Sequence, residues 1–245
     1  MKVVLIIQAR MTSTRLPGKI LREIMGKPLL QYQIERLRKV DLAHEIVIAT
    51  TANNSDQPVV ELCSKLGVKY FRGPEDDVLE RFYRAALENQ ADVVVRLTGD
   101  CPVIDPLIVN KVIGLYLDNQ DKVDYVSNVL QRTYPRGMDT EVFSFQVLRE
   151  AFNEAAAPAE REHVTPFIYG QPNRYRLANV AYTRDESRYR WTVDTPDDFE
   201  LIKRIIESLY PIKHDFTLED MLDLFDKNSE WYSINSHVEQ KKIGE

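Results

Sequence analysis

Strand-like runs alternate with amphipathic segments along the first half of the chain. Three of the runs, 3–7, 45–51 and 92–100, are continuous stretches rich in β-branched residues. Such stretches are typical of strands buried on both faces of a parallel sheet. The fourth run, 68–71, is shorter. The segments between them repeat apolar residues at helical spacing and predict helices over 27–40, 55–67, 76–90 and 105–117. This alternation predicts an α/β fold with a doubly wound, mostly parallel sheet, whose ligands bind at the carboxyl ends of the strands.

The pattern changes after residue 124, where short strands and helices no longer alternate regularly. We expect strands within 124–143, over 175–183 and over 188–194, with helices over 144–156, 195–210 and 217–228 and a helix followed by a loop over 160–171. We interpret residues 1–245 as a single domain, with about 125–185 as an inserted α+β region. The polar stretch 233–245 is expected to fray.

Composition excludes several classes of protein. The formal net charge of −6 argues against a nucleic-acid coat, which needs a broad basic surface. Two cysteines are too few for a disulfide framework, and the four histidines lack zinc-site spacing. No apolar run reaches membrane-spanning length. We therefore expect a cytoplasmic protein that binds neither membrane nor nucleic acid.

The loop "QARMTSTRLPGK" (8–19) follows the first predicted strand and concentrates positive charge. It matches neither the G-x-G-x-x-G pattern nor the P-loop pattern, so charge would come from Arg10, Arg15 and Lys19 instead of glycine-rich backbone amides. Arginine grips phosphate oxygens in pairs, and lysine supplies a point charge. The alternative is a solvated basic turn ending at Pro17–Gly18.

Two aspartates follow later predicted strands. Asp100 lies in "TGDCP" (98–102), and Asp194 lies in "TVDTPDDFE" (192–200), whose other polar residues are explained by the start of a helix. A carboxylate at such a position can hold a divalent cation against phosphates, although each could merely cap a turn. Together with the cationic loop, the pair predicts a site for magnesium and a polyphosphate.

These three motifs resemble those of the sugar-acid cytidylyltransferases, which activate 3-deoxy-manno-octulosonate and acylneuraminate with CMP. Residues 8–19 resemble the signature A-R-x-x-S-T-R-L-P-x-K, "TGDCP" resembles Q-G-D-x-P, and "VDTPDDFE" resembles V-D-T-P-x-D-x-E. The stretches 72–86, 134–144 and 160–170 are more similar to the SpsF branch, which serves spore-coat polysaccharide synthesis. The resemblance implies the fold of the nucleotide-diphospho-sugar transferases and transfer of CMP from CTP to a sugar acid.

The resemblance also implies roles for individual residues. Arg10 and Lys19 would contact the CTP phosphates, and Asp100 and Asp194 would hold Mg²⁺. The remaining residues of the CTP site would be Ala9, Ser13, Arg15, Arg81 and Thr98. Thr98 stands where the octulosonate enzymes have glutamine, so contacts on that side are expected to differ.

The acceptor is assigned to the stretch between the two aspartates. Its polar residues could bind the carboxylate and hydroxyls of a sugar acid of nonulosonic or octulosonic type; they are Arg136, Asp139, Glu141, Arg161 and His163. The alternative for 160–162 is a solvated helix start. A homodimer formed through about 125–185 is expected from the resemblance. Two other functions stay open: nucleotidyl transfer to a phosphorylated or non-sugar acceptor, and nucleotide binding without catalysis.

Overall fold

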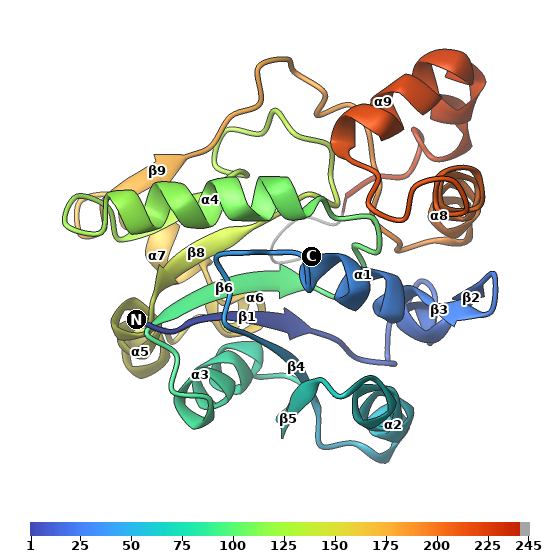
Figure 1. The fold of residues 1–245 in the computed structure, drawn as a ribbon. Coiled ribbons are helices and arrows are strands. Elements are labelled where there is room, and N and C mark those ends of the chain that lie inside the picture. The colour runs from blue at the N-terminus through green and yellow to red at the C-terminus, as the bar shows by residue number, and fades with distance from the viewer. Residues whose placement is uncertain (241–245) are drawn as a thin grey trace.

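A seven-stranded sheet forms the centre of the protein in the computed structural model, which describes residues 1–240 (Figure 1). Its order is β5-β4-β1-β6-β8-β7-β9, and β8 alone runs antiparallel to its neighbours. The strands are β1 (Val3–Gln8), β4 (Glu45–Thr51), β5 (Lys69–Gly73), β6 (Val93–Thr98), β7 (Tyr125–Ser127), β8 (Glu141–Ser144) and β9 (Leu177–Asn179). A separate hairpin pairs β2 (Glu23–Ile24) with β3 (Lys27–Pro28). The predicted α/β class and the mostly parallel sheet are confirmed.

Helices cover both faces of the sheet, and side chains of β1 alternate between the two. Val3, Leu5 and Ile7 face the core formed with helices α1 (Leu29–Leu37), α2 (Gln57–Leu66), α4 (Pro106–Asp118), α8 (Pro196–Leu209) and α9 (Leu218–Lys227). Val4 and Ile6 face the core formed with α3 (Val78–Glu88), α5 (Phe145–Glu154) and α7 (Pro166–Tyr169). The short α6 (Pro158–His163) packs against α3. Burial on both sides explains why β1 is apolar without alternation.

The strand order places a crevice beside the end of β1. From β1 the chain proceeds outward to β4 and β5, and then returns through α3 to β6 on the other side of β1. The connections after β1 and β6 therefore leave the sheet in opposite directions, which is the position where open α/β sheets bind ligands. The loop 9–18 and the turn that begins at Gly99 flank this position.

One predicted strand is wrong. Residues 188–194 include a continuously buried run, 189–193, like that of a strand inside a sheet, but they form only an isolated bridge between Arg136 and Arg190. Their backbone groups bond to loops instead: Trp191 donates to the carbonyl of Arg136 at 2.8 Å, and Val193 donates to that of Asp100 at 2.9 Å. The segment thus ties the turn after β6 to the start of α8.

The C-terminal stretch does not fray as far as the structure describes it. A 3₁₀ helix covers Ser229–Ile234, and Asn235 is buried. The amide nitrogen of Asn235 donates to Asp198 Oδ1 and to the carbonyl of Arg190, both at 2.8 Å. These bonds hold Asn235 against the start of α8, so the expected fraying is wrong for 233–235, whereas 241–245 lie outside the described residues.

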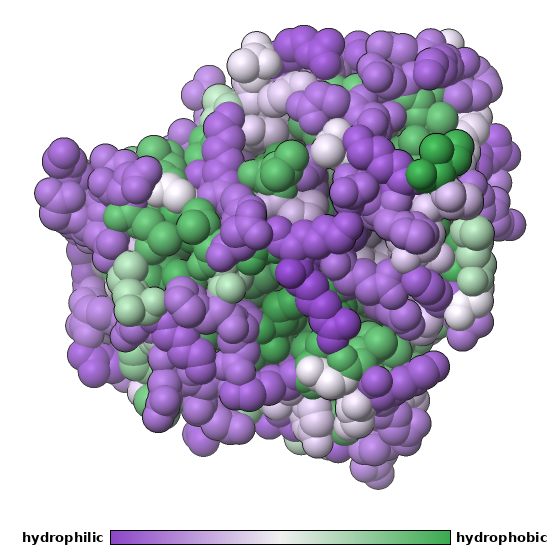
Figure 2. All heavy atoms as spheres, in the orientation of Figure 1, coloured by the Kyte–Doolittle hydropathy of each residue, from purple (hydrophilic) through white to green (hydrophobic). Residues whose placement is uncertain are grey.

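The surface is mostly hydrophilic on the face shown in Figure 2, with hydrophobic residues visible in patches between polar ones. Among residues 1–240, no helix combines the length and the apolar character that crossing a membrane requires.

Gly137 provides a test of how the loop between β7 and β8 packs against Trp191. Its φ is +103°, and a Cβ built there would lie 2.4 Å from the carbonyl oxygen of Trp191. We predict that Gly137→Ala lowers the free energy of unfolding by about 3 kcal/mol, because strain and a backbone clash add. Gly26→Ala is the matched control, with φ +75° and open space around the added methyl, and should cost about 1 kcal/mol. Equal losses in urea unfolding would contradict the predicted clash.

Candidate active site

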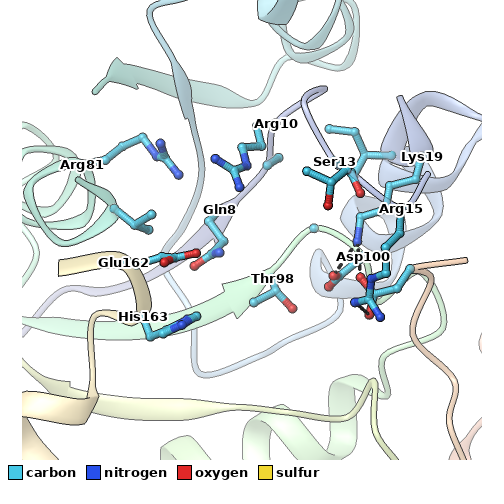
Figure 3. Close-up of a pocket in the computed structure, with 16 residues that line it drawn as sticks. Gln8, Arg10, Ser13, Arg15, Lys19, Arg81, Thr98, Asp100, Glu162 and His163 are labelled. Atoms are coloured by element: carbon cyan, nitrogen blue, oxygen red, sulfur yellow. Dashed lines mark hydrogen bonds and ion pairs between the residues drawn. The ribbon is translucent and has the colours of Figure 1, made fainter. Parts of the chain in front are cut away.

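A polar pocket lies at the crevice between the ends of β1 and β6 (Figure 3). Its volume is about 930 Å³, including its open mouth. The structure brings together at this pocket most of the residues predicted from the sequence: Ala9, Arg10, Ser13, Arg15, Lys19, Arg81, Thr98, Asp100, His163 and Asp194. Loops distant in sequence thus contribute to one site.

Lys19 is the centre of the site's charges. Its Nζ lies 2.9 Å from Asp100 Oδ2 and 2.7 Å from Asp194 Oδ1. Burial alone would lower the pKa of Lys19, but the two carboxylates outweigh it and raise that pKa. Burial likewise would raise the pKa of Asp100, and Lys19 outweighs it and lowers that pKa to about 2. The lysine is therefore a fixed cation, and Asp100 is ionised at neutral pH.

Two arginines contact the second carboxylate oxygen of Asp194, Oδ2. Arg15 Nη2 lies 2.9 Å from Asp194 Oδ2, and Arg190 contacts the same oxygen. Arg190 also donates through Nε to Asp198 Oδ1 at 2.9 Å. The buried Asp198 in turn accepts from the backbone amides of Asp194 and Thr195, at 2.9 and 3.0 Å. These contacts fix the direction of the Asp194 side chain.

The sequence did not lead us to Arg190 as a partner of Asp194, or to Asp198 as the carboxylate that holds Arg190. The acids at the start of α8 were explained by helix capping, and Thr195 does cap the helix with Asp198 as its reciprocal partner. The signal that could have found the additional contact is the buried-strand pattern before Asp194, since an arginine within such a pattern needs a carboxylate partner. Arg190 lies there, four residues before Asp194.

Arg10 is paired with a carboxylate that the sequence reasoning also missed. Its Nη1 lies 3.3 Å from Glu75 Oε1, and Glu75 further accepts from the side chains of Thr12 and Asn53. Arg81, on α3, donates to the carbonyl of Pro74 at 2.7 Å. Burial lowers the pKa of Arg81 to about 10. The segment after β5 thereby fixes two of the cations that line the pocket.

Four residues predicted to bind the acceptor are not among those that line this pocket in the described chain. Arg161 donates to Asp77 at 2.9 Å, and Asp139 pairs with Arg132. Glu141 is buried and contacts Arg96. The backbone of Arg136 bonds to that of Tyr189 and Trp191. Of the predicted acceptor set, His163 alone reaches the pocket, accompanied by its neighbour Glu162, which was not predicted.

The fold and the crevice define an α/β protein with a charged pocket at the end of its first strand. A family model described as cytidylyltransferase matches residues 4–235. The chain therefore belongs to the cytidylyltransferase family, as the motif resemblance predicted.

Three known proteins illustrate the similarity. The spore coat polysaccharide biosynthesis protein SpsF of Bacillus subtilis is 33% identical, with 92% of this chain and 95% of the relative aligned. A 3-deoxy-manno-octulosonate cytidylyltransferase of Geobacter metallireducens is 36% identical over 46% of this chain and 44% of its own length. The structure of a cytidylyltransferase from Leptospira borgpetersenii superimposes with a TM-score of 0.91 at 36% identity, covering 99% of this chain and 100% of the other.

The depressed pKa of Asp100 predicts how stability depends on pH. Its folded-state pKa is about 2 against an ordinary value of 3.8, so ionised Asp100 stabilises the fold above pH 3.8, and this contribution is lost as the pH falls towards 2. We expect the wild type to exceed Asp100→Asn in unfolding free energy by about 1–2 kcal/mol at pH 7. In urea unfolding, that difference should shrink between pH 4 and pH 2. A difference that is constant over this range would contradict the assigned ion pair.

Proposed function

We propose that this cytidylyltransferase transfers CMP from CTP to a sugar acid of nonulosonic or octulosonic type, releases pyrophosphate, and serves surface or spore-coat polysaccharide synthesis. The observation that carries the proposal is the position of Lys19, at the end of the cationic loop, between Asp100 and Asp194. The motif resemblance and the names of the relatives support the choice of CTP and of a sugar acid.

The cationic loop supplies the contacts for the triphosphate. Arg10, Arg15 and Lys19 line the pocket within one short segment, and Ser13 adds a hydroxyl to the same wall. Guanidinium groups bind phosphate oxygens in pairs, whereas the ammonium of Lys19 acts as a point charge. Nucleotidyl transfer depends mainly on such positioning and charge neutralisation, since the protein needs no covalent nucleophile.

The carboxylates of Asp100 and Asp194 fit a magnesium ion. They contribute hard oxygen donors that converge on one position, which the ammonium of Lys19 occupies and would leave when the ion binds. The described residues contain no group of three or more side chains that could hold a metal ion. Magnesium is commonly held by one or two carboxylates together with substrate phosphates and water, so this donor set is sufficient. When bound, Mg²⁺ would neutralise charge on the phosphates.

At the α-phosphorus, the proposed reaction forms one P–O bond and breaks another. The anomeric hydroxyl oxygen of the sugar acid attacks the α-phosphorus of CTP, and the bond from that phosphorus to the bridging oxygen of the β-phosphate breaks. Pyrophosphate leaves, and the hydroxyl proton is released. Lys19 and Arg10 stabilise the negative charge that develops on the phosphate oxygens.

The acceptor would enter from the side of the inserted region, about 125–185. That region supplies Glu162 and His163 to the pocket wall. The other predicted acceptor residues, including Arg136 and Arg161, would hold the inserted region in position, or would reach the acceptor only after their side chains move. A homodimer formed through the same region is part of this proposal.

The test measures pyrophosphate release from CTP and Mg²⁺ with 3-deoxy-manno-octulosonate, N-acetylneuraminate and other nonulosonic acids. We predict that Asp100→Asn and Lys19→Ala each reduce kcat by about 10³-fold, because Lys19→Ala removes a cation that stabilises the transferring phosphate and Asp100→Asn removes a carboxylate that would hold the magnesium ion. Lys27→Ala is the matched control, since Lys27 pairs with Glu35 and Tyr210 outside the pocket-lining set.

Different failures identify different alternatives. Absence of both CTP binding and turnover would overturn the proposal. Turnover only with a phosphorylated sugar or a non-sugar acceptor would favour the wider nucleotidyltransferase function. CTP that is bound but never cleaved with any acceptor would favour a non-catalytic protein. Full activity of Asp100→Asn would overturn the assignment of that carboxylate to the metal.

A further inference from the structure

Gln8 occupies a position in the pocket to which neither the motifs nor the resemblance assigned a role. It is the last residue of β1, and it pairs in register with Thr98, the last residue of β6. Residues paired across neighbouring parallel strands project to the same face, and both of these residues line the pocket. In Figure 3 Gln8 lies between Arg10 and Thr98, towards the centre of the pocket.

A buried network fixes the orientation of the Gln8 amide. Arg96 donates through Nη2 to Gln8 Oε1 at 3.2 Å. A guanidinium only donates hydrogen bonds, so the oxygen of the amide must face Arg96. The Nε2 group is consequently the end of the side chain from which a hydrogen bond can be donated to a ligand.

Arg96 is itself held in place by Glu141. The Glu141 carboxylate contacts Arg96 Nη1 and accepts from the hydroxyls of Tyr125, at 2.5 Å, and Thr165, at 2.6 Å. Glu141 is only 5% exposed, so breaking this ion pair would leave a buried charge without its partner. The network joins β6, β7, β8 and the start of α7, and it therefore gives Gln8 a rigid support.

The place of Gln8 in the pocket indicates which ligand it meets. Arg15, Lys19 and Asp100 lie at one end, Glu162 and His163 of α6 lie at the other, and Arg10 lies near Gln8 between them (Figure 3). Gln8, at the end of β1, and Thr98, at the end of β6, lie between these two ends. A group at this position adjoins the part of the pocket formed by the inserted region.

We propose that Gln8 determines acceptor specificity by donating a hydrogen bond from Nε2 to an oxygen of the sugar acid near its reacting hydroxyl. This inference rests on the proposed function. It also accounts for a departure noted in the sequence: Thr98 stands where the octulosonate enzymes have glutamine, and here a carboxamide enters the same part of the sheet edge from the neighbouring strand, β1.

The test compares Gln8→Met with the wild type, using CTP, Mg²⁺ and either 3-deoxy-manno-octulosonate or N-acetylneuraminate. Methionine retains the length of the side chain and removes the donor. We predict that kcat/KM for the acceptor falls about 10- to 100-fold, because a ligand oxygen loses its partner, whereas the Kd for CTP changes less than about 2-fold. Gln31→Met, on the outer part of α1, is the matched control and should behave as the wild type.

A second variant separates a specific contact from a general loss of structure. In Gln8→Met/Thr98→Gln the carboxamide returns on β6, and recovery of at least part of the acceptor kcat/KM is expected. An unchanged kcat/KM in Gln8→Met would overturn the inference alone, as would an equal loss of CTP affinity. Absence of both CTP binding and turnover in the wild type, with every octulosonic and nonulosonic acid of the panel, would overturn the proposed function and this inference with it.

Discussion

The ion pairs that Lys19 forms with Asp100 and Asp194 are the constraint on which the site depends. They connect segments separated by 81 and 175 residues, so three parts of the fold must be correctly placed before they can form. Each part has its own support: Gly18 in a left-handed conformation precedes Lys19, the end of β6 leads to Asp100, and the capped start of α8 follows Asp194. Because all three charges are largely removed from water, loss of one would leave the others without compensation.

The other cations of the loop that line the pocket are likewise paired with carboxylates of the protein. Arg15 is paired with Asp194, and Arg10 is paired with Glu75, so the predicted phosphate contacts already have carboxylate partners within the protein. A triphosphate would therefore compete with Glu75 for Arg10 instead of meeting a free guanidinium. Such competition reduces the net gain from phosphate binding, but the same ion pairs hold the strongly charged loop in one arrangement. Specific recognition then depends on ligand groups that replace several of these partners at once.

The sequence predicted the fold, and it predicted that the cationic loop and the two aspartates lie at one edge of the sheet, because both depend on local patterns. Strands buried on both faces, and helices such as α8 with its Thr195 cap, carry their signals within a few residues, and the position of a loop after β1 follows from the class of sheet. The strand over 188–194 was predicted wrongly because the segment is buried as a strand would be, but its hydrogen-bond partners are loops that no local pattern shows. Arg190 and Glu75 escaped notice for the same reason, since their partners lie in other segments or were explained by a simpler local role.

The residues of the inserted region show why reading side-chain chemistry alone overstates a binding site. Glu141 and Arg161 suit a sugar acid by type, but in the structure one secures Arg96 between two strands and the other joins α6 to α3 through Asp77. These ion pairs hold elements whose neighbours do line the pocket, namely Gln8 on β1 and the last two residues of α6, Glu162 and His163. A substitution at Glu141 would therefore act through the rigidity of Gln8. With the proposed role of Gln8, acceptor selection would depend on how tightly the sheet edge is supported as well as on the groups that face the ligand.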